Sequence, residues 1–200
     1  MVEAEENALN TRIEEQVRKI LDVYDRAREN IDANVLREVV IPTIVVIGLQ
    51  SHGKSSVLEN IARIALPKGR DTVTRTPLEL KLRRRPPGGP DDHDYAIIRH
   101  KNMPEGSSRQ IDDLDQIEAE IRKMSDEITG GVAERLVDIP IYLTIYRLNQ
   151  IDLTMIDLPG LKYFQEGDAS NHGGKPINEV IVDIWRPYIT NDNAVILLTI

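Results

Sequence analysis

The chain has 200 residues and a formal net charge of −8, with 40% apolar residues, 29% charged residues and no cysteine. This length fits one domain, and the acidic balance argues against broad nucleic-acid binding. The lack of cysteine excludes disulfides, thiolate zinc sites and cysteine nucleophiles. No apolar run approaches the ~20 residues of a membrane-spanning helix, and the acidic N-terminus does not resemble a signal peptide, so we expect a cytoplasmic location, with a peripheral location at membranes as the alternative.

Residues 7–36 predict one long amphipathic helix, because apolar residues recur mostly at spacings of three, four or seven opposite a charged face. Two arrangements are open: the helix packs on its own domain, or it joins a bundle with segments outside this chain. We therefore separate residues 1–39, an N-terminal amphipathic helix, from residues 40–200, which we expect to form an α/β domain.

The expected α/β domain has a mostly parallel central sheet flanked by helices. Continuous β-branched residues over 41–47 are typical of a strand buried on both faces, and a helix is expected over 54–65. Residues 78–85 and 94–101 resemble a hairpin around a Pro/Gly-rich turn. The later elements are expected to be a helix over 112–128, strands over 139–148 and 151–157, a loop over 161–176, a helix over 176–190 and a strand over 194–200.

The segment Gly48–Ser55 matches the phosphate-loop pattern G-x-x-x-x-G-K-[ST]. Backbone N–H groups of such a loop, together with the start of the following helix, surround phosphate oxygens. Here Lys54 would bridge the β- and γ-phosphates, and the Ser55 hydroxyl would bind Mg²⁺. The position between a buried strand and a helix indicates a P-loop NTPase fold with a nucleotide site. The alternative is a plain strand–turn–helix.

A second signal, Asp157-Leu158-Pro159-Gly160, stands at the end of a predicted strand. Asp157 would meet Mg²⁺ through water, and Gly160 would offer its N–H to the γ-phosphate. The same residues also favour an ordinary strand-ending turn. Next to a phosphate loop, the D-x-P-G pattern favours GTP over ATP.

A third signal is the threonine-rich segment Thr72–Pro77, which precedes the next strand. A GTPase needs a threonine there, whose hydroxyl meets Mg²⁺ and whose backbone holds the γ-phosphate and the attacking water. Thr74 is the preferred candidate, and Thr72 and Thr76 are the alternatives.

These motifs together resemble the dynamin superfamily of large GTPases. Residues 48–59 are similar to its GxQSxGKSSxLE loop, and residues 66–78 resemble its LPRG…VTRRPL switch I. Lys54 and Asp157 lie about a hundred residues apart, and the elements between them resemble the insertion that enlarges the dynamin GTPase domain. The likeness covers about residues 40–200 and points to the dynamin-related or Mx-like branch.

The resemblance implies Mg²⁺-dependent GTP hydrolysis that is activated by head-to-head dimerisation and coupled to membrane remodelling. Gln50 and Thr74 would position the water, while Ser51 would hold a monovalent cation, K⁺ or Na⁺. The resemblance also implies GTP and GDP as ligands, and contact with membranes or microtubules through regions outside this chain. The implied nucleotide contacts are Gly48, Gln50, Ser51, His52, Gly53, Lys54, Ser55, Ser56, Asp157 and Gly160, with Gln50, Ser51, Thr74 and Gly160 in the catalytic set.

The chain departs from the family pattern at three positions. His52 replaces a small residue, Asp71 replaces a glycine, and Thr76 replaces an arginine. The guanine-reading T-K-x-D motif would follow residues 194–200, so guanine preference rests on the resemblance and a truncated domain is expected. Two alternatives stay open: a non-hydrolysing nucleotide-binding interaction module, and an ATP-using P-loop protein.

Overall fold

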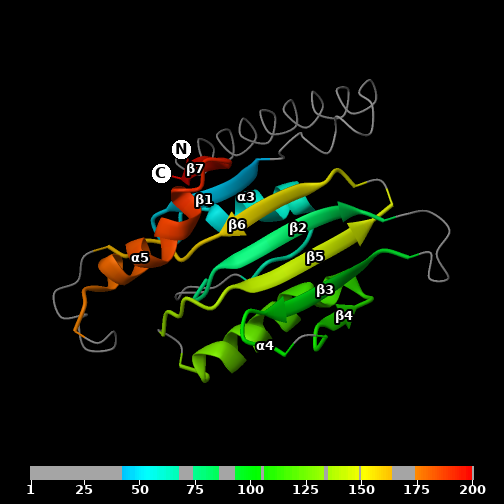
Figure 1. The fold of residues 1–200 in the computed structure, drawn as a ribbon, viewed down its shortest axis with the longest axis horizontal. Helices are drawn as coiled ribbons and strands as arrows, with labels where there is room; N and C mark the ends of the chain where they lie inside the picture. The colour runs from blue at the N-terminus through cyan, green and yellow to red at the C-terminus, as the bar shows by residue number, and fades with distance from the viewer. Residues whose placement is uncertain are drawn as a thin grey trace, which may run out of the picture.

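The computed structural model describes residues 42–67, 74–85, 93–104, 106–132, 135–148, 150–163 and 174–199. These residues contain seven strands, β1 Thr43–Gly48, β2 Leu78–Arg84, β3 Tyr95–His100, β4 Arg109–Ile111, β5 Ile141–Arg147, β6 Leu153–Asp157 and β7 Ala194–Thr199. The strands form one sheet in the order β4-β3-β5-β2-β6-β1-β7 (Figure 1). The long helix expected over 7–36 lies outside the described residues.

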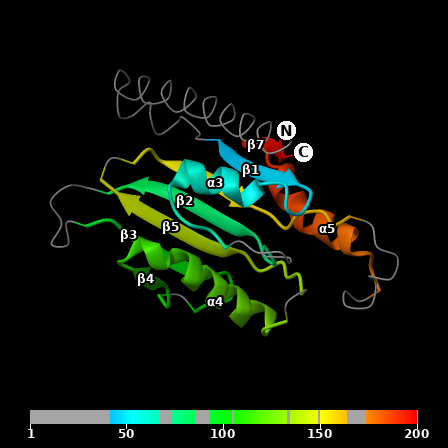
Figure 2. The same cartoon turned by 180° about the vertical axis from the view of Figure 1, so that it is seen from behind.

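In the described part of the chain, three α-helices flank the sheet: α3 Lys54–Ala62, α4 Ile117–Thr129 and α5 Ile177–Ile189. The views from the two sides show α3 and α4 on one face and α5 on the other (Figures 1 and 2). The alternating buried leucines and isoleucines of β2 and β5 pack beneath α3 and α4, and Trp185 of α5 packs on the opposite face with Val45 of β1. The expected α/β fold is thus confirmed. None of the described helices is both long and apolar enough to cross a bilayer.

The sheet is mixed, whereas the sequence led us to expect mostly parallel strands. β1 runs parallel to β6 and β7, and β2 runs parallel to β5. The pairs β2–β6, β3–β5 and β3–β4 are antiparallel. A strand that runs parallel to the preceding strand of the same sheet needs a crossover of about a dozen residues or more, and the short links from β3 to β4 and from β5 to β6 provide no such crossover. The chain therefore reverses direction at these links.

The expected hairpin of residues 78–85 and 94–101 is wrong. Both segments are strands, β2 and β3, but β5 lies between them and pairs with each. Leu143 of β5 stands opposite Leu80 on one side and Ile98 on the other. The turn-like composition of the intervening segment indicated a reversal, but it carried no information about the strand that enters the gap.

Three further elements differ in detail from the expectation. The helix expected over 112–128 begins as one 3₁₀ turn, Leu114–Gln116, and continues as α4. Gly130 ends it in the left-handed conformation, which glycine adopts without strain. α3 ends at Ala62, earlier than expected, and the three-residue strand β4 was not foreseen.

Candidate nucleotide-binding site

The phosphate loop connects β1 to α3 as a tight curve of backbone. Ser51 and Gly53 have positive φ angles of 64° and 73°. Gln50 N donates to Leu161 O at 2.8 Å, and Leu161 N donates to Gly48 O at 3.0 Å. The loop is therefore held against the segment that follows β6. A non-glycine residue such as Ser51 adopts this conformation at a cost, which the surrounding structure must offset.

Lys54 is the first residue of α3, and its side chain is 6% exposed. Its Nζ donates to Leu49 O at 2.6 Å, so the ammonium lies inside the curve of the loop. Burial lowers the pKa of Lys54, and the charge of Asp157 opposes that shift. A buried ammonium makes stronger hydrogen bonds to charged phosphate oxygens than to a neutral carbonyl, so exchanging Leu49 O for a phosphate would be favourable.

Asp157 ends β6 next to β1, in register with Val46. Its Oδ2 accepts hydrogen bonds from Ser55 Oγ at 2.7 Å and from Thr74 Oγ1 at 3.2 Å. Its Oδ1 is buried and has no hydrogen-bond partner within the described part of the chain. Burial raises the pKa of Asp157, while the Ser55 hydrogen bond and the Lys54 charge oppose the shift.

The mixed direction of the sheet explains how Thr74 reaches Asp157. Because β2 runs antiparallel to β6, its first residue, Leu78, pairs with Asp157, the last residue of β6. The segment before β2 therefore arrives at the carboxyl edge of β1 and β6. Thr76, the other described threonine of residues 72–77, donates its hydroxyl to Ile139 O instead. The rival Thr72 and the departure Asp71 lie outside the described residues.

Gly160 lies directly on the phosphate loop. A Cβ built on it would stand 2.8 Å from both Gln50 N and Gln50 Cα, and it would collide with Lys54 Nζ. Real Cβ atoms essentially never approach backbone this closely. Only glycine lets the turn after β6 sit against the loop at this distance, which places its backbone beside the Lys54 ammonium.

The remaining loop residues differ in their surroundings. His52 Nδ1 lies 2.8 Å from Gln50 O, and its Nε2 lies 3.3 Å from Tyr163 Oη. The Ser51 side chain is exposed, and Ser56 is half-buried in the first turn of α3. Tyr163 follows the D-x-P-G turn, and no sequence signal had singled it out.

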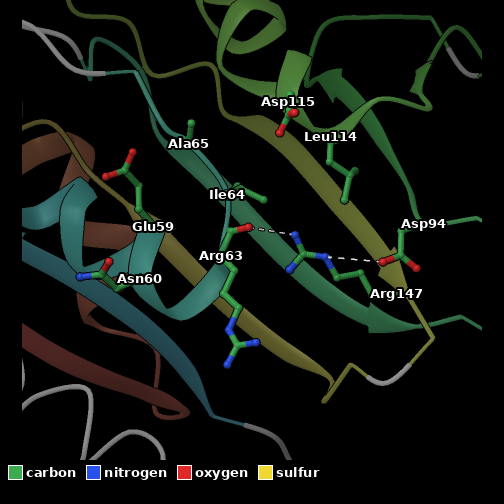
Figure 3. A pocket seen from close by; sticks show the side chains of 9 residues that line it. All are labelled: Glu59, Asn60, Arg63, Ile64, Ala65, Asp94, Leu114, Asp115 and Arg147. Carbon is green, nitrogen blue, oxygen red and sulfur yellow. Dashed lines mark hydrogen bonds and ion pairs between the residues drawn. The ribbon is translucent and has the colours of Figure 1, made fainter.

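A second support that the sequence did not reveal lies at the other end of α3 (Figure 3). Arg147, the last residue of β5, donates from Nη1 to Ala62 O at 2.7 Å and from Nη2 to Arg63 O at 3.0 Å. Its Nε lies 4.0 Å from Asp94 Oδ2. Arg63, Asp94 and Arg147 line a hollow of about 570 Å³. Arg147 thus satisfies carbonyls at the C-terminal end of the helix that begins at Lys54.

The fold and the site define a class of protein, the P-loop nucleotide-binding proteins. A phosphate loop joins a buried strand to a helix, and an acidic residue ends the neighbouring parallel strand. The family model described as "Dynamin family" matches residues 44–200. The chain belongs to the dynamin family.

Named relatives agree with this assignment. The chain is similar to the interferon-induced GTP-binding protein Mx of Epinephelus coioides, at 36% identity over 97% of this chain and 29% of the relative. It is 41% identical to the Mx protein of Perca fluviatilis over 84% of this chain and 52% of the relative. It is 35% identical to MxB of Danio rerio over 94% of this chain and 27% of the relative. The chain therefore spans well under two thirds of these relatives.

Proposed function

We propose that this chain forms part of a GTPase domain that binds GTP with Mg²⁺ and hydrolyses it. One observation carries the proposal: the hydroxyls of Ser55 and Thr74 converge on one oxygen of Asp157, beside the buried Lys54. These residues come from the phosphate loop, from the segment before β2 and from the end of β6. The name that these relatives carry, GTP-binding protein, supports guanosine triphosphate as the ligand.

The oxygen atoms around Asp157 fit a magnesium ion. Hydroxyl and carboxylate oxygens are the ligands that Mg²⁺ prefers, and it usually keeps several waters. Asp157 Oδ1, which is buried without a hydrogen-bond partner among the described residues, leaves acceptor capacity for such a water. Ser55 and Thr74 would bind the ion directly and Asp157 through water. When bound, the ion would neutralise charge on the phosphates.

The protein residues themselves would bind and orient the triphosphate. Lys54 would contact β- and γ-phosphate oxygens, while loop N–H groups from Gly48 to Ser56 and the N–H of Gly160 would surround the phosphates. Gln50 and Thr74 would position the attacking water. The contacts of His52 with Gln50 O and Tyr163 support a role for His52 in holding the loop's shape.

Assembly and cellular role are further parts of the proposal, and they rest on the family alone. The GTPase domains would associate head to head, and Ser51 would hold K⁺ or Na⁺ at the shared site. Hydrolysis would be coupled to membrane remodelling or to microtubule contact through regions of a longer protein.

The test combines binding with turnover. Calorimetry should show Mg²⁺-dependent binding of GTP in preference to ATP, and Lys54→Ala should abolish it because the variant lacks the buried cation. GTP affinity that is unchanged in Lys54→Ala would refute the site. The hydrolysis rate per molecule should rise with protein concentration if the domains associate. Binding without turnover at any concentration would instead support a non-hydrolysing module.

A further inference from the structure

Arg75 directly follows Thr74 and joins it to the C-terminal end of α4. Its Nη2 lies 2.5 Å from Asp126 Oδ1, and its Nη1 donates to Thr129 Oγ1 at 3.2 Å and to Val132 O at 3.4 Å. The Arg75 side chain is 12% exposed, against 58% for Asp126. The negative end of a helix favours a cation, so this guanidinium is held both by an ion pair and by the helix terminus.

The backbone around Arg75 is hydrogen-bonded to the segment that connects α4 to β5. Val137 N donates to Arg75 O at 3.0 Å, and the Thr76 hydroxyl donates to Ile139 O. On the opposite side, Thr74 Oγ1 donates to Asp157 Oδ2. A short run of backbone therefore links the end of α4 to the oxygen cluster, and the planar peptide bond between Thr74 and Arg75 fixes the distance between their Cα atoms.

We propose that Arg75 is a positioning residue and that its clamp to Asp126 fixes the placement of Thr74. The clamp is a feature of the described contacts, while its effect on hydrolysis rests on the proposed function. Catalysis that works by positioning is sensitive to small displacements, and a shift of about 1 Å can cost on the order of 10²-fold in rate. Asp126 is more than half exposed, so a change at this residue of α4 can alter the rate of hydrolysis without touching the nucleotide.

Two neighbouring carboxylates on α4 provide a matched comparison. Asp126→Asn removes the charge that holds Arg75. Glu127→Gln makes the same chemical change one residue later, where the carboxylate pairs with Arg109 of β4 at 2.8 Å. Both side chains are exposed, so differences in overall folding should be small.

Three quantities are measured in the full chain: kcat for GTP, the dissociation constant of a fluorescent GTP analogue, and hydrogen exchange at the Val137 amide. Asp126→Asn should lower kcat about tenfold and raise Val137 exchange about tenfold, the loss expected for one charge-assisted contact. Its nucleotide dissociation constant should change less than about twofold, since no phosphate contact is lost. Glu127→Gln should match the unaltered chain in all three.

A charge exchange tests the pair directly. Arg75→Asp combined with Asp126→Arg should recover part of the Val137 protection and part of the kcat that Arg75→Asp alone removes.

Several outcomes would overturn the clamp: unchanged Val137 exchange in Asp126→Asn, equal effects in Glu127→Gln, or faster exchange with unaltered kcat. If the unaltered chain binds GTP but shows no turnover, the proposed hydrolysis fails. Val137 exchange then still decides whether Asp126 holds Arg75.

Discussion

Replacing Gly160 with alanine tests how closely the turn after β6 must approach the phosphate loop. The added methyl group would lie 2.8 Å from Gln50 N and Cα, whereas ordinary contacts begin near 3.4 Å. The loop or the turn must therefore move by at least about half an ångström. Overpacking of this kind typically costs about 1–3 kcal/mol, and the displaced groups include Lys54.

We expect Gly160→Ala to weaken binding of GTP with Mg²⁺ by about 10- to 100-fold, since each 1.4 kcal/mol corresponds to a tenfold change. Titration of a fluorescent GTP analogue measures this, and thermal unfolding measures any loss of stability. Gly106→Ala is the control, because its Cβ would meet nothing within 4 Å, although its φ of 81° adds backbone strain. Gly160→Ala with unaltered affinity and turnover would refute the close approach.

Three more predictions concern the stability that buried or half-buried polar side chains contribute. Without nucleotide, the free energy of unfolding should fall as pH rises from 3.8, the ordinary pKa of an aspartate, through the raised pKa of Asp157 in the folded state, because the folded state keeps a proton that the unfolded state loses. Asp157→Asn should flatten this pH dependence in unfolding experiments at several pH values. An identical pH dependence in both proteins would contradict the prediction. Arg147→Gln should lower the melting temperature by several degrees, about 1–2 kcal/mol, since the α3 carbonyls lose a charged donor; an unchanged melting curve would argue against that support. Ser125→Ala should raise the free energy of unfolding by about 1 kcal/mol, because the Ser125 hydroxyl is buried without a partner in the described residues; a loss of stability in denaturant titration would show that a water satisfies it.

The phosphate loop was readable from the sequence because its chemistry is contiguous. Gly48–Ser55 carries the glycines, the lysine and the hydroxyl in one short run, and the flanking strand and helix have clear patterns. Asp157 was also recognisable from its position at a strand end. The structure brings Asp157 and Ser55 within 2.7 Å, but this meeting depends on β6 lying beside β1.

Contacts that depend on the order of strands in the sheet could not be predicted from the sequence. The expected hairpin would have put β2 beside β3, but Thr74 reaches Asp157 because β2 runs antiparallel to β6. The clamp between Arg75 and Asp126 joins residues about fifty positions apart. Nothing in the local sequence distinguishes Arg75 or Asp126 from a charged residue that faces solvent, so local patterns gave no reason to pair them.

The central position of β2 has a consequence for how this chain folds during synthesis. Both of its neighbours, β5 and β6, come more than fifty residues later, so one edge of β2 stays unpaired until β5 has been synthesised and the other until β6 has been synthesised. Such distant pairings are slow to form, because the entropy of closing the intervening loop is lost before any contact is gained. A nucleotide bound at the phosphate loop can stabilise the native state only after that closure, and until then the free strand edges invite aggregation.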